Sequence, residues 1–331
     1  MCEKQRLNKK GKQNKMKKLF TSLAVLVAIT VSAFSFLACN GNDPVFVRDG
    51  VIQVITREAG SGTRSAFLAS VFTGDDAITG GYANIVMPGT AGDSTSVATM
   101  RAMVGSNPQA IGFDSFGALS AAGDDSVRIL SVGGVTPSIT TVQNNTYSIS
   151  RPFLVAHREA SLMTPQAAEF LRFLSSSQAR EIMIEEGFVP RSLATAPAFS
   201  QTAGVSGAVT IIGSSSVVEL MGILAEEFED ITTGITIAVT GGGSGGGRSA
   251  IASGTHDFGM VSAVMSASHV TYISSNTPAA YTTFADDAVA VIVNAANPLT
   301  NITRAQLATI FNAEHANHID RWTTLVPATN A

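Results

Sequence analysis

Short apolar runs alternate with longer stretches of helical periodicity from residue 51 onward. The apolar runs predict β-strands at residues 51–56, 110–113, 127–132, 153–156, 209–212, 235–240 and 288–294. The helical stretches predict helices at residues 64–72, 165–185, 217–230, from 248 onward and at 303–311. This alternation is typical of α/β layers, and no repeat of fixed period accompanies it.

Residues 165–185 give the strongest helical signal. Pro165 stands in the expected first turn and Gly187 follows the expected end. An apolar stripe lies along this helix at Ala168, Leu171, Leu174 and Ile182. Residues 195–207 are small and polar by contrast, which predicts a linker or a long surface loop.

Three of the predicted strand–helix junctions share one composition. Residues 57–63, 213–216 and 241–247 are rich in glycine, serine and threonine. Glycine permits a tight turn, and the N–H groups of a helix start favour an anion, as do hydroxyl donors. Arg57 adds a planar cation to the first junction. Each alone is most simply a glycine turn with an N-cap, but three together favour an anion site at the strand ends.

Other chemistries fit the sequence less well. The glycine run 241–247 also fits a Walker-type phosphate loop and a dinucleotide fingerprint, yet no acidic partner follows at a strand end. His315 and His318 lie near acidic residues, but such a pair on a polar segment is typical of solvated surface, so no metal site is expected. Neither Ser61 nor Ser216 lies in a G-x-S-x-G elbow, which argues against a serine hydrolase. Three acidic pairs are interpreted as loop solvation: Asp75 and Asp76, Asp124 and Asp125, and Asp286 and Asp287.

Residues 1–38 have the features of an export signal. Every lysine of the chain lies in residues 1–18, and an apolar run follows at 19–38. The run ends at Cys39 in a sequence that resembles a bacterial lipoprotein processing box, which predicts lipidation of Cys39 and a tether at 39–44. A plain signal peptide or a retained anchor helix is the alternative, and Met1 and Met16 are both candidate starts.

The sign of the charge changes after this leader. Residues 1–18 carry eight Lys and Arg and one Glu, whereas the remainder carries thirteen Arg and twenty-four Asp and Glu. An acidic body disfavours nucleic acid and anionic membrane surfaces as partners, so an anion site must act through local donors. No cysteine follows Cys39, which excludes thiol nucleophiles and cysteine-based zinc sites in the body.

These junctions and several other segments resemble the phosphate-binding proteins of high-affinity phosphate ABC importers. Residues 51–190 resemble the second half of that family, through Arg57-x-x-x-Ser61-Gly62-Thr63 and segments 107–113, 133–137, 147–152 and 187–190. Residues 207–322 resemble its first half, through segments 213–217, 241–247, 254–260, 290–294 and 307–322. The resemblance implies an α/β fold of the two-lobed, type II periplasmic-binding-protein kind, with mixed sheets flanked by helices and a ligand cleft between the lobes.

The two halves stand in the reverse of the family's order. The end near Trp322 is where the family would continue into the strand at 51–56, which suggests a circular permutation with its junction at 195–207. The alternative is a chain cut from a tandem pair. Under the permutation, residues 157–287 form a continuous lobe, and residues 45–152 with 289–331 form a discontinuous one.

The resemblance also implies which residues contact the ligand. The phosphate contacts carried over by motif are Arg57, Ser61, Gly62 and Thr63 from the discontinuous lobe, and Ser216, the Val217 N–H, Ser244 and Ser262 from the continuous lobe. Arg57 is the one cation of this set. Some family members have a carboxylate where Ser262 stands, and a serine repels fully ionised sulfate less strongly.

The function that follows from the resemblance is capture and delivery of inorganic phosphate. We expect an exported, lipid-anchored monomer that passes phosphate to an ABC permease, with no cofactor and no catalytic activity. The alternatives are a binding protein or sensor for sulfate or molybdate and, more remotely, an enzyme acting on phosphate esters.

Overall fold

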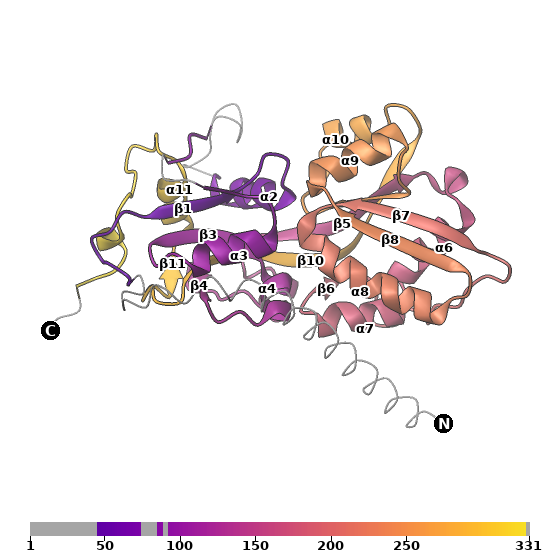
Figure 1. The fold of residues 1–331 in the computed structure, drawn as a ribbon, viewed down its shortest axis with the longest axis horizontal. Helices are drawn as coiled ribbons and strands as arrows, with labels where there is room; N and C mark the ends of the chain where they lie inside the picture. The colour runs from indigo at the N-terminus through magenta and orange to yellow at the C-terminus, as the bar shows by residue number, and fades with distance from the viewer. Residues whose placement is uncertain (1–44, 74–84, 89–91, 329–331) are drawn as a thin grey trace, which may run out of the picture. The chain divides into compact units, whose positions relative to one another are not determined.

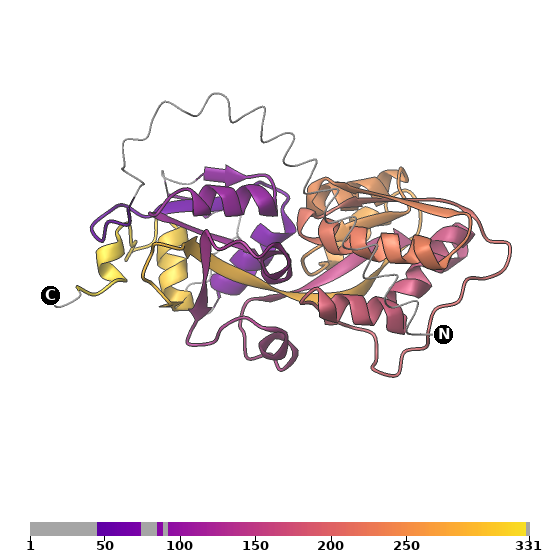
Figure 2. The ribbon, with the colours of Figure 1, turned by 60° about the horizontal axis from the view of Figure 1, so that its bottom comes forward.

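The 16-residue strand β10 (Ala279–Asn294) runs through both halves of the fold (Figures 1 and 2). Its residues 289–293 pair antiparallel with β3 (Ala110–Ser115), and its residues 279–288 pair antiparallel with β5 (Ser150–Arg158). The computed structural model describes residues 45–73, 85–88 and 92–328, and those from Phe46 onward belong to one compact unit. The expected leader, Cys39 and the tether lie outside the described residues.

We call the part built around β1 and the end of β10 the β1 half. The parallel strands β2, β1 and β3 lie beside β10 in that order, and β4 pairs with both β10 and β11. Its further strands are β1 (Gln53–Arg57), β2 (Gly92–Ser94), β4 (Val127–Val132) and β11 (Asn301–Ile302). Its helices are α2 (Gly62–Val71), α3 (Val97–Gly105), α4 (Phe116–Ala122), α5 (Ile139–Gln143), α11 (Arg304–Phe311) and the 3-10 helix η5 (Trp322–Thr324).

We call the part built around β7 and the start of β10 the β7 half. Strand β7 pairs parallel with β8 and β9, and β9 pairs antiparallel with β5. Its further strands are β6 (Val189–Pro190), β7 (Gly207–Gly213), β8 (Ile235–Gly241) and β9 (Phe258–Val261). Its helices are the 3-10 helix η4 (Ala160–Leu162), α6 (Pro165–Leu174), α7 (Ser177–Glu185), α8 (Ser215–Ile231), α9 (Gly243–Ser253) and α10 (Ala267–Ile273).

Helices cover both faces of the sheet in each half. Along β10, Val289 and Val291 pack with α2 and α11, whereas Ala290 and Ile292 pack with α3, as the period-2 alternation of a doubly covered strand requires. Strand β5 alternates in the same way between the α6–α8 side and the α9–α10 side. The expected mixed sheets flanked by helices are therefore confirmed. None of the described helices is long and apolar enough to cross a membrane.

The helix predicted at 165–185 is in fact two helices. Helix α6 ends at Leu174, and the Ser176 side chain accepts a hydrogen bond from Ala179 N–H to cap α7. Serine hydroxyls compete for backbone hydrogen bonds and favour a new helix start, which explains the break. The predicted stripe is partly confirmed, because Leu174 is buried and Leu171 and Ile182 pack against the same core. The stripe leaves out the other buried residues of α6, which are Ala167, Glu169, Phe170 and Phe173.

Residues 195–206 have no helix or strand, and β7 begins at Gly207. This segment nevertheless packs against the β7 half. Phe199 packs against Phe173 and Phe228 at centroid distances of 5.8 and 5.3 Å, and its N–H donates to the Gln178 side chain at 2.8 Å. The chain between α7 and β7 is therefore held by its own side chains rather than being a loose tether.

Candidate functional site

All three glycine- and serine-rich junctions lie at helix starts, and each helix begins earlier than the sequence predicts. Helix α2 begins at Gly62, α8 at Ser215 and α9 at Gly243. The first-turn N–H groups of a helix have no partner within the helix, so this shift places such donors inside the junctions themselves. The expected ligand residues in or next to these first turns are Ser61, Gly62, Thr63, Ser216, Val217 and Ser244.

The glycine run 241–247 is therefore mostly the first turn of α9 and not a loop. A Cβ added at Gly247 would lie 2.6 Å from the Met260 carbonyl oxygen, so α9 approaches β9 more closely than a larger residue would allow. Tertiary packing here outweighs the low helix propensity of glycine, which is why the sequence pattern misplaced the helix start.

The β1 half contributes Arg57 and the start of α2. Arg57 is the last residue of β1, and its side chain is buried, as are Ser61 and Thr63. The Ser61 oxygen accepts a hydrogen bond from Arg64 N–H at 3.3 Å and so acts as the N-cap of α2. Its hydroxyl proton stays free to be donated elsewhere, because a hydroxyl can accept and donate together.

The β7 half contributes buried serines from α8, α9 and the segment after β9. Ser216, Ser244 and Ser262 are each at most 1% exposed. Ser262 N–H donates to Ser244 Oγ at 3.1 Å, which leaves the Ser244 proton as a donor. The Val217 N–H, expected to face the ligand, donates instead to the Ser214 carbonyl oxygen at 3.0 Å within its own turn.

Residues of the two halves meet directly at these helix starts. Thr63 Oγ1 and Ser216 Oγ lie 2.8 Å apart, and Gly245 N–H donates to the Gly60 carbonyl oxygen at 3.1 Å. A Cβ added at Gly62 would fall onto the hydroxyl oxygens of Ser244 and Ser262. The structure thus brings Arg57, Gly62, Thr63, Ser216, Ser244 and Ser262 to one junction between the halves.

Two further serines belong to this junction although the motif comparison passed over them. Arg57 Nη2 donates to Ser215 Oγ at 2.9 Å, and Ser214 Oγ donates to Ser262 Oγ at 2.7 Å. The run of three serines at 214–216 was the available signal, since all three hydroxyls of such a run at a helix start can face one site.

The junction also holds a second buried cation, which is not one of the eight expected ligand residues. Arg57 pairs with the neighbouring Glu58 through Nε at 2.8 Å and Nη2 at 2.9 Å. Arg151 on β5 donates from Nη1 to Thr63 Oγ1 at 2.6 Å and pairs with Asp287. Asp287 was interpreted as a solvated loop residue, but it is 2% exposed and lies in β10.

A third buried charge site, Asp114, lies at the end of β3. Its Oδ1 accepts from Ser115 N–H at 2.8 Å, and its Oδ2 is buried with no hydrogen-bond partner in the described part of the chain. Burial raises the pKa of Asp114 to about 7, although Arg101, Arg57 and Arg151 oppose the shift. Burial therefore favours the protonated form of Asp114 well above the usual pH range of a carboxyl.

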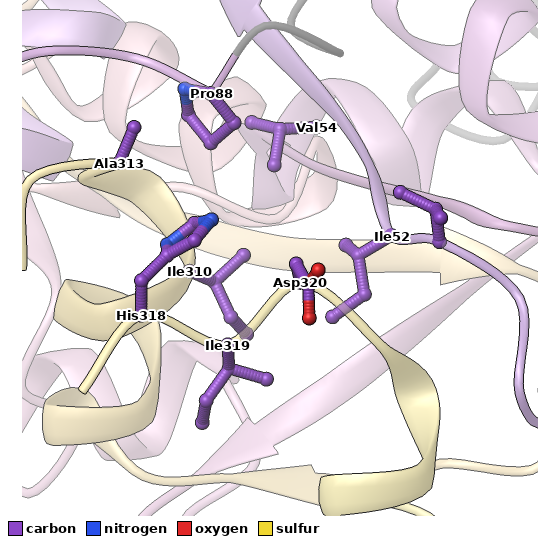
Figure 3. Close-up of a pocket in the computed structure, with 9 residues that line it drawn as sticks. Ile52, Val54, Pro88, Ile310, Ala313, His318, Ile319 and Asp320 are labelled. Carbon is purple, nitrogen blue, oxygen red and sulfur yellow. The ribbon is translucent and has the colours of Figure 1, made fainter.

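A cavity of about 410 Å³ opens beside the junction. Glu58 and Ser215, two of the partners of Arg57, line it together with glycines of the run 241–246. A second cavity, of about 220 Å³, lies elsewhere in the β1 half, where Ile52, Val54 and Ile310 surround it (Figure 3). None of the eight expected ligand residues lines this second cavity.

The other candidate groups have ordinary surroundings. His318 Nδ1 lies 2.7 Å from the Thr309 carbonyl oxygen, and no three His, Cys, Asp or Glu side chains gather as a metal would require within 45–73, 85–88 and 92–328. Asp124 and Asp125 are exposed, as expected. Asp75 and Asp76 lie outside the described residues.

Comparison with known proteins gives consistent relatives. A PBP superfamily domain model matches residues 198–330. The phosphate-binding protein PstS 2 of Streptococcus pneumoniae is 31% identical over 297 residues, which cover 89% of this chain and 97% of that one. PstS 2 of Streptococcus agalactiae is 27% identical over 298 residues, with 90% and 97% coverage.

A solved structure agrees with these sequences. The crystal structure of a phosphate-binding protein of a phosphate ABC transporter from S. pneumoniae superposes with a TM-score of 0.63 at 28% identity, over 84% of this chain and all of that one. The relatives are named as binding proteins and not as enzymes. The chain therefore belongs to the PstS family of phosphate-binding proteins, as the sequence motifs indicated.

Proposed function

We propose that this protein binds inorganic phosphate between its β1 and β7 halves and delivers it to an ABC permease. The observation that supports this most strongly is the meeting of Thr63 and Ser216 at 2.8 Å, each in the first turn of a helix from a different half. A tetrahedral anion can take hydrogen bonds from both sides of such a junction at once.

The donors present are sufficient for tight binding. A hydrogen bond to a charged group contributes about 1.5–3 kcal/mol, so six to eight donors exceed the roughly 8 kcal/mol of micromolar affinity after ordering costs. The expected donors are Arg57, Ser61, Gly62 and Thr63 from one side and Ser216, Ser244 and Ser262 from the other. The Val217 N–H would join them only by leaving the Ser214 carbonyl oxygen. To bind, Thr63 and Ser216 would exchange their mutual hydrogen bond for bonds to the anion, which couples binding to the relative position of the halves.

We also propose that residues 45–152 with 289–331 and residues 157–287 act as two lobes that close on the anion. Strands β5 and β10, which pair with each other, would form the two crossings between the lobes. A closed form recognised by the permease would link ligand capture to delivery.

The segment order is proposed to be a circular permutation. Ile52 N–H donates to the Asp320 carbonyl oxygen at 2.8 Å, and Val51 forms an isolated antiparallel β-bridge with Arg321. The chain near residue 320 therefore lies beside the start of β1. This neighbourhood supports a continuation from the end near Trp322 into β1, with the new junction at 195–207.

Export and anchoring are proposed from the leader sequence. Residues 1–38 would be removed, Cys39 would carry the lipid, and 39–44 would tether a monomeric body outside the cytoplasm. Mass spectrometry of the protein from membranes tests this proposal, since an unmodified Cys39 would contradict it.

Calorimetry with phosphate, sulfate and molybdate tests the ligand. We expect phosphate to bind at micromolar concentration or tighter, and sulfate to bind more weakly. Because the neutral Ser262 repels sulfate less than a carboxylate would, the difference between the two affinities should be smaller than with a carboxylate at this position. Absence of heat with phosphate at submillimolar concentration would overturn the proposal, and tighter binding of sulfate or molybdate would reassign the ligand.

A further inference from the structure

Arg151 and Asp287 form a buried ion pair on the two strands that run between the halves. They stand directly opposite each other in the antiparallel pairing of β5 with β10. Arg151 donates to Asp287 Oδ2 from Nη2 at 2.9 Å and from Nε at 3.2 Å, and both side chains are 1% exposed. Because an unpaired charge at such a site is costly, the two groups hold each other in place.

Further contacts fix the orientation of this pair. Asp287 Oδ1 accepts from Gly117 N–H at 3.1 Å, in the first turn of α4. The Arg151 guanidinium lies 5.2 Å from the ring centre of Phe153. The Arg151 side chain is therefore held by two strands, a helix start and an aromatic ring, which leaves Nη1 aimed at a defined point.

That point is the hydroxyl of Thr63. Arg151 Nη1 lies 2.6 Å from Thr63 Oγ1, and Arg57 Nη1 approaches the same oxygen at 3.5 Å. A guanidinium can only donate, so the Thr63 oxygen is the acceptor in both contacts and its two lone pairs are used. The single Thr63 proton must then be donated elsewhere, and the structure places Ser216 Oγ 2.8 Å away in the β7 half.

We propose that Arg151, held by Asp287, is a positioning residue that fixes Thr63 as a hydrogen-bond donor toward the β7 half and thus toward the bound anion. Arg151 does not itself touch the anion. The inference rests on the proposed phosphate binding and names a residue, outside the expected ligand set, on which the geometry of that site depends.

The same strand offers a matched control. Asp286, next to Asp287 on β10, pairs with Arg191, and this pair is more exposed, at 17% and 57%. Neighbouring residues of a strand point to opposite faces, and no contact of the Arg191–Asp286 pair reaches Thr63 among the described hydrogen bonds. Loss of either pair removes an ion pair to an aspartate of β10. Only the loss of the Arg151–Asp287 pair should also release the Thr63 hydroxyl.

The test is a double-mutant cycle on the purified full chain. The first change is the pair Arg151→Gln with Asp287→Asn, which leaves the net charge unaltered, and the second is Thr63→Val. Calorimetry should show about tenfold weaker phosphate binding for the pair variant in the native background, and less than about twofold in the Thr63→Val background. The control pair Arg191→Gln with Asp286→Asn should change affinity less than about twofold.

Equal losses in both backgrounds, or an equal loss for the control pair, would overturn the inference. Should the pair variant fail to fold, Arg151→Lys replaces it, because a lysine can pair with Asp287 but cannot also supply the second fixed donor to Thr63. Native affinity in Arg151→Lys would then contradict the proposal.

A ligand-free readout separates this inference from the proposed function. Urea unfolding of the same four proteins should show that the Arg151–Asp287 and Thr63 changes are not additive, whatever the protein binds. If the native chain takes up no phosphate, the proposed function fails, and additive unfolding energies would show that the Arg151–Thr63 contact fails as well.

Discussion

The two halves bring different chemistry to one junction. The β1 half contributes Arg57 with its partner Glu58. Arg151 reaches the same Thr63 hydroxyl from β5, one of the two strands that run between the halves. The residues identified there from the β7 half are uncharged, namely Ser214, Ser215, Ser216, Val217, Ser244 and Ser262. We infer that the β1 half attracts and orients the anion through charge, whereas the β7 half completes its hydrogen bonds on closure.

The largest expected effect concerns the buried carboxyl of the β1 half. Because burial raises the pKa of Asp114 from 3.8 to about 7, the folded state holds this proton more tightly than the unfolded chain. The resulting stability is fully present below about pH 4 and is lost as pH rises to about 7, by roughly 1.4 kcal/mol per unit and about 4 kcal/mol in all.

Urea unfolding between pH 4 and 8 measures this loss against Asp114→Asn. The variant cannot titrate at this position. The native chain should therefore lose stability relative to the variant between about pH 4 and pH 7, and the difference should stay constant above about pH 7. Parallel curves would show that Asp114 does not hold its proton in the folded state.

Removal of the Arg57 cation should have the next largest effect. Arg57→Ala deletes several charge-assisted donors, so phosphate affinity should fall about a hundredfold or more. Calorimetry measures the phosphate affinity of this variant, and Arg321→Ala, at an exposed position, is the control. An affinity unchanged within twofold would place the anion site elsewhere.

A wedge between the halves should have a smaller effect. Gly62→Ala adds a Cβ against the hydroxyl oxygens of Ser244 and Ser262, so closure is hindered and phosphate affinity should fall about tenfold. Gly246→Ala is the matched control, because a Cβ there meets nothing within 4 Å. Equal affinities for the two variants would mean that the halves do not meet at Gly62 when the anion is bound.

Loss of one neutral donor from the β7 half should have the smallest effect. Ser216→Ala removes one hydroxyl, so affinity should fall about three- to tenfold, far less than for Arg57→Ala. Ser249→Ala, at an exposed position of α9, should bind as the native chain does. A loss as large as that of Arg57→Ala would contradict the division between a charged and a neutral half.

Local patterns were enough to predict most elements of the fold. The strand at 127–132 is found with the same limits, and the helix expected at 303–311 is α11 with Thr303 as its N-cap. The start of β10 was missed because two threonines and the Asp286–Asp287 pair interrupt the apolar positions before the run of 288–294. The sequence pattern placed the starts of α2, α8 and α9 too late. Glycine and serine have low helix propensity, but close packing keeps them helical at these positions.

The candidate site was predictable only where it follows a motif. Thr63 and Ser216 stand in recognisable junctions, and the structure brings them together. Arg151 and Asp287 are 136 residues apart and meet through the register of β5 with β10, which no local pattern encodes. A buried aspartate in a strand resembles a solvated one in sequence, and this is why Asp287 was misinterpreted.

A crystal structure of the phosphate complex tests the central claim most directly. We expect phosphate oxygens at hydrogen-bond distance, about 2.7–3.2 Å, from the Arg57 guanidinium of the β1 half and the Ser216 hydroxyl of the β7 half in the same molecule. Phosphate held by one half alone, or in the cavity beside Ile52 and Ile310, would contradict it.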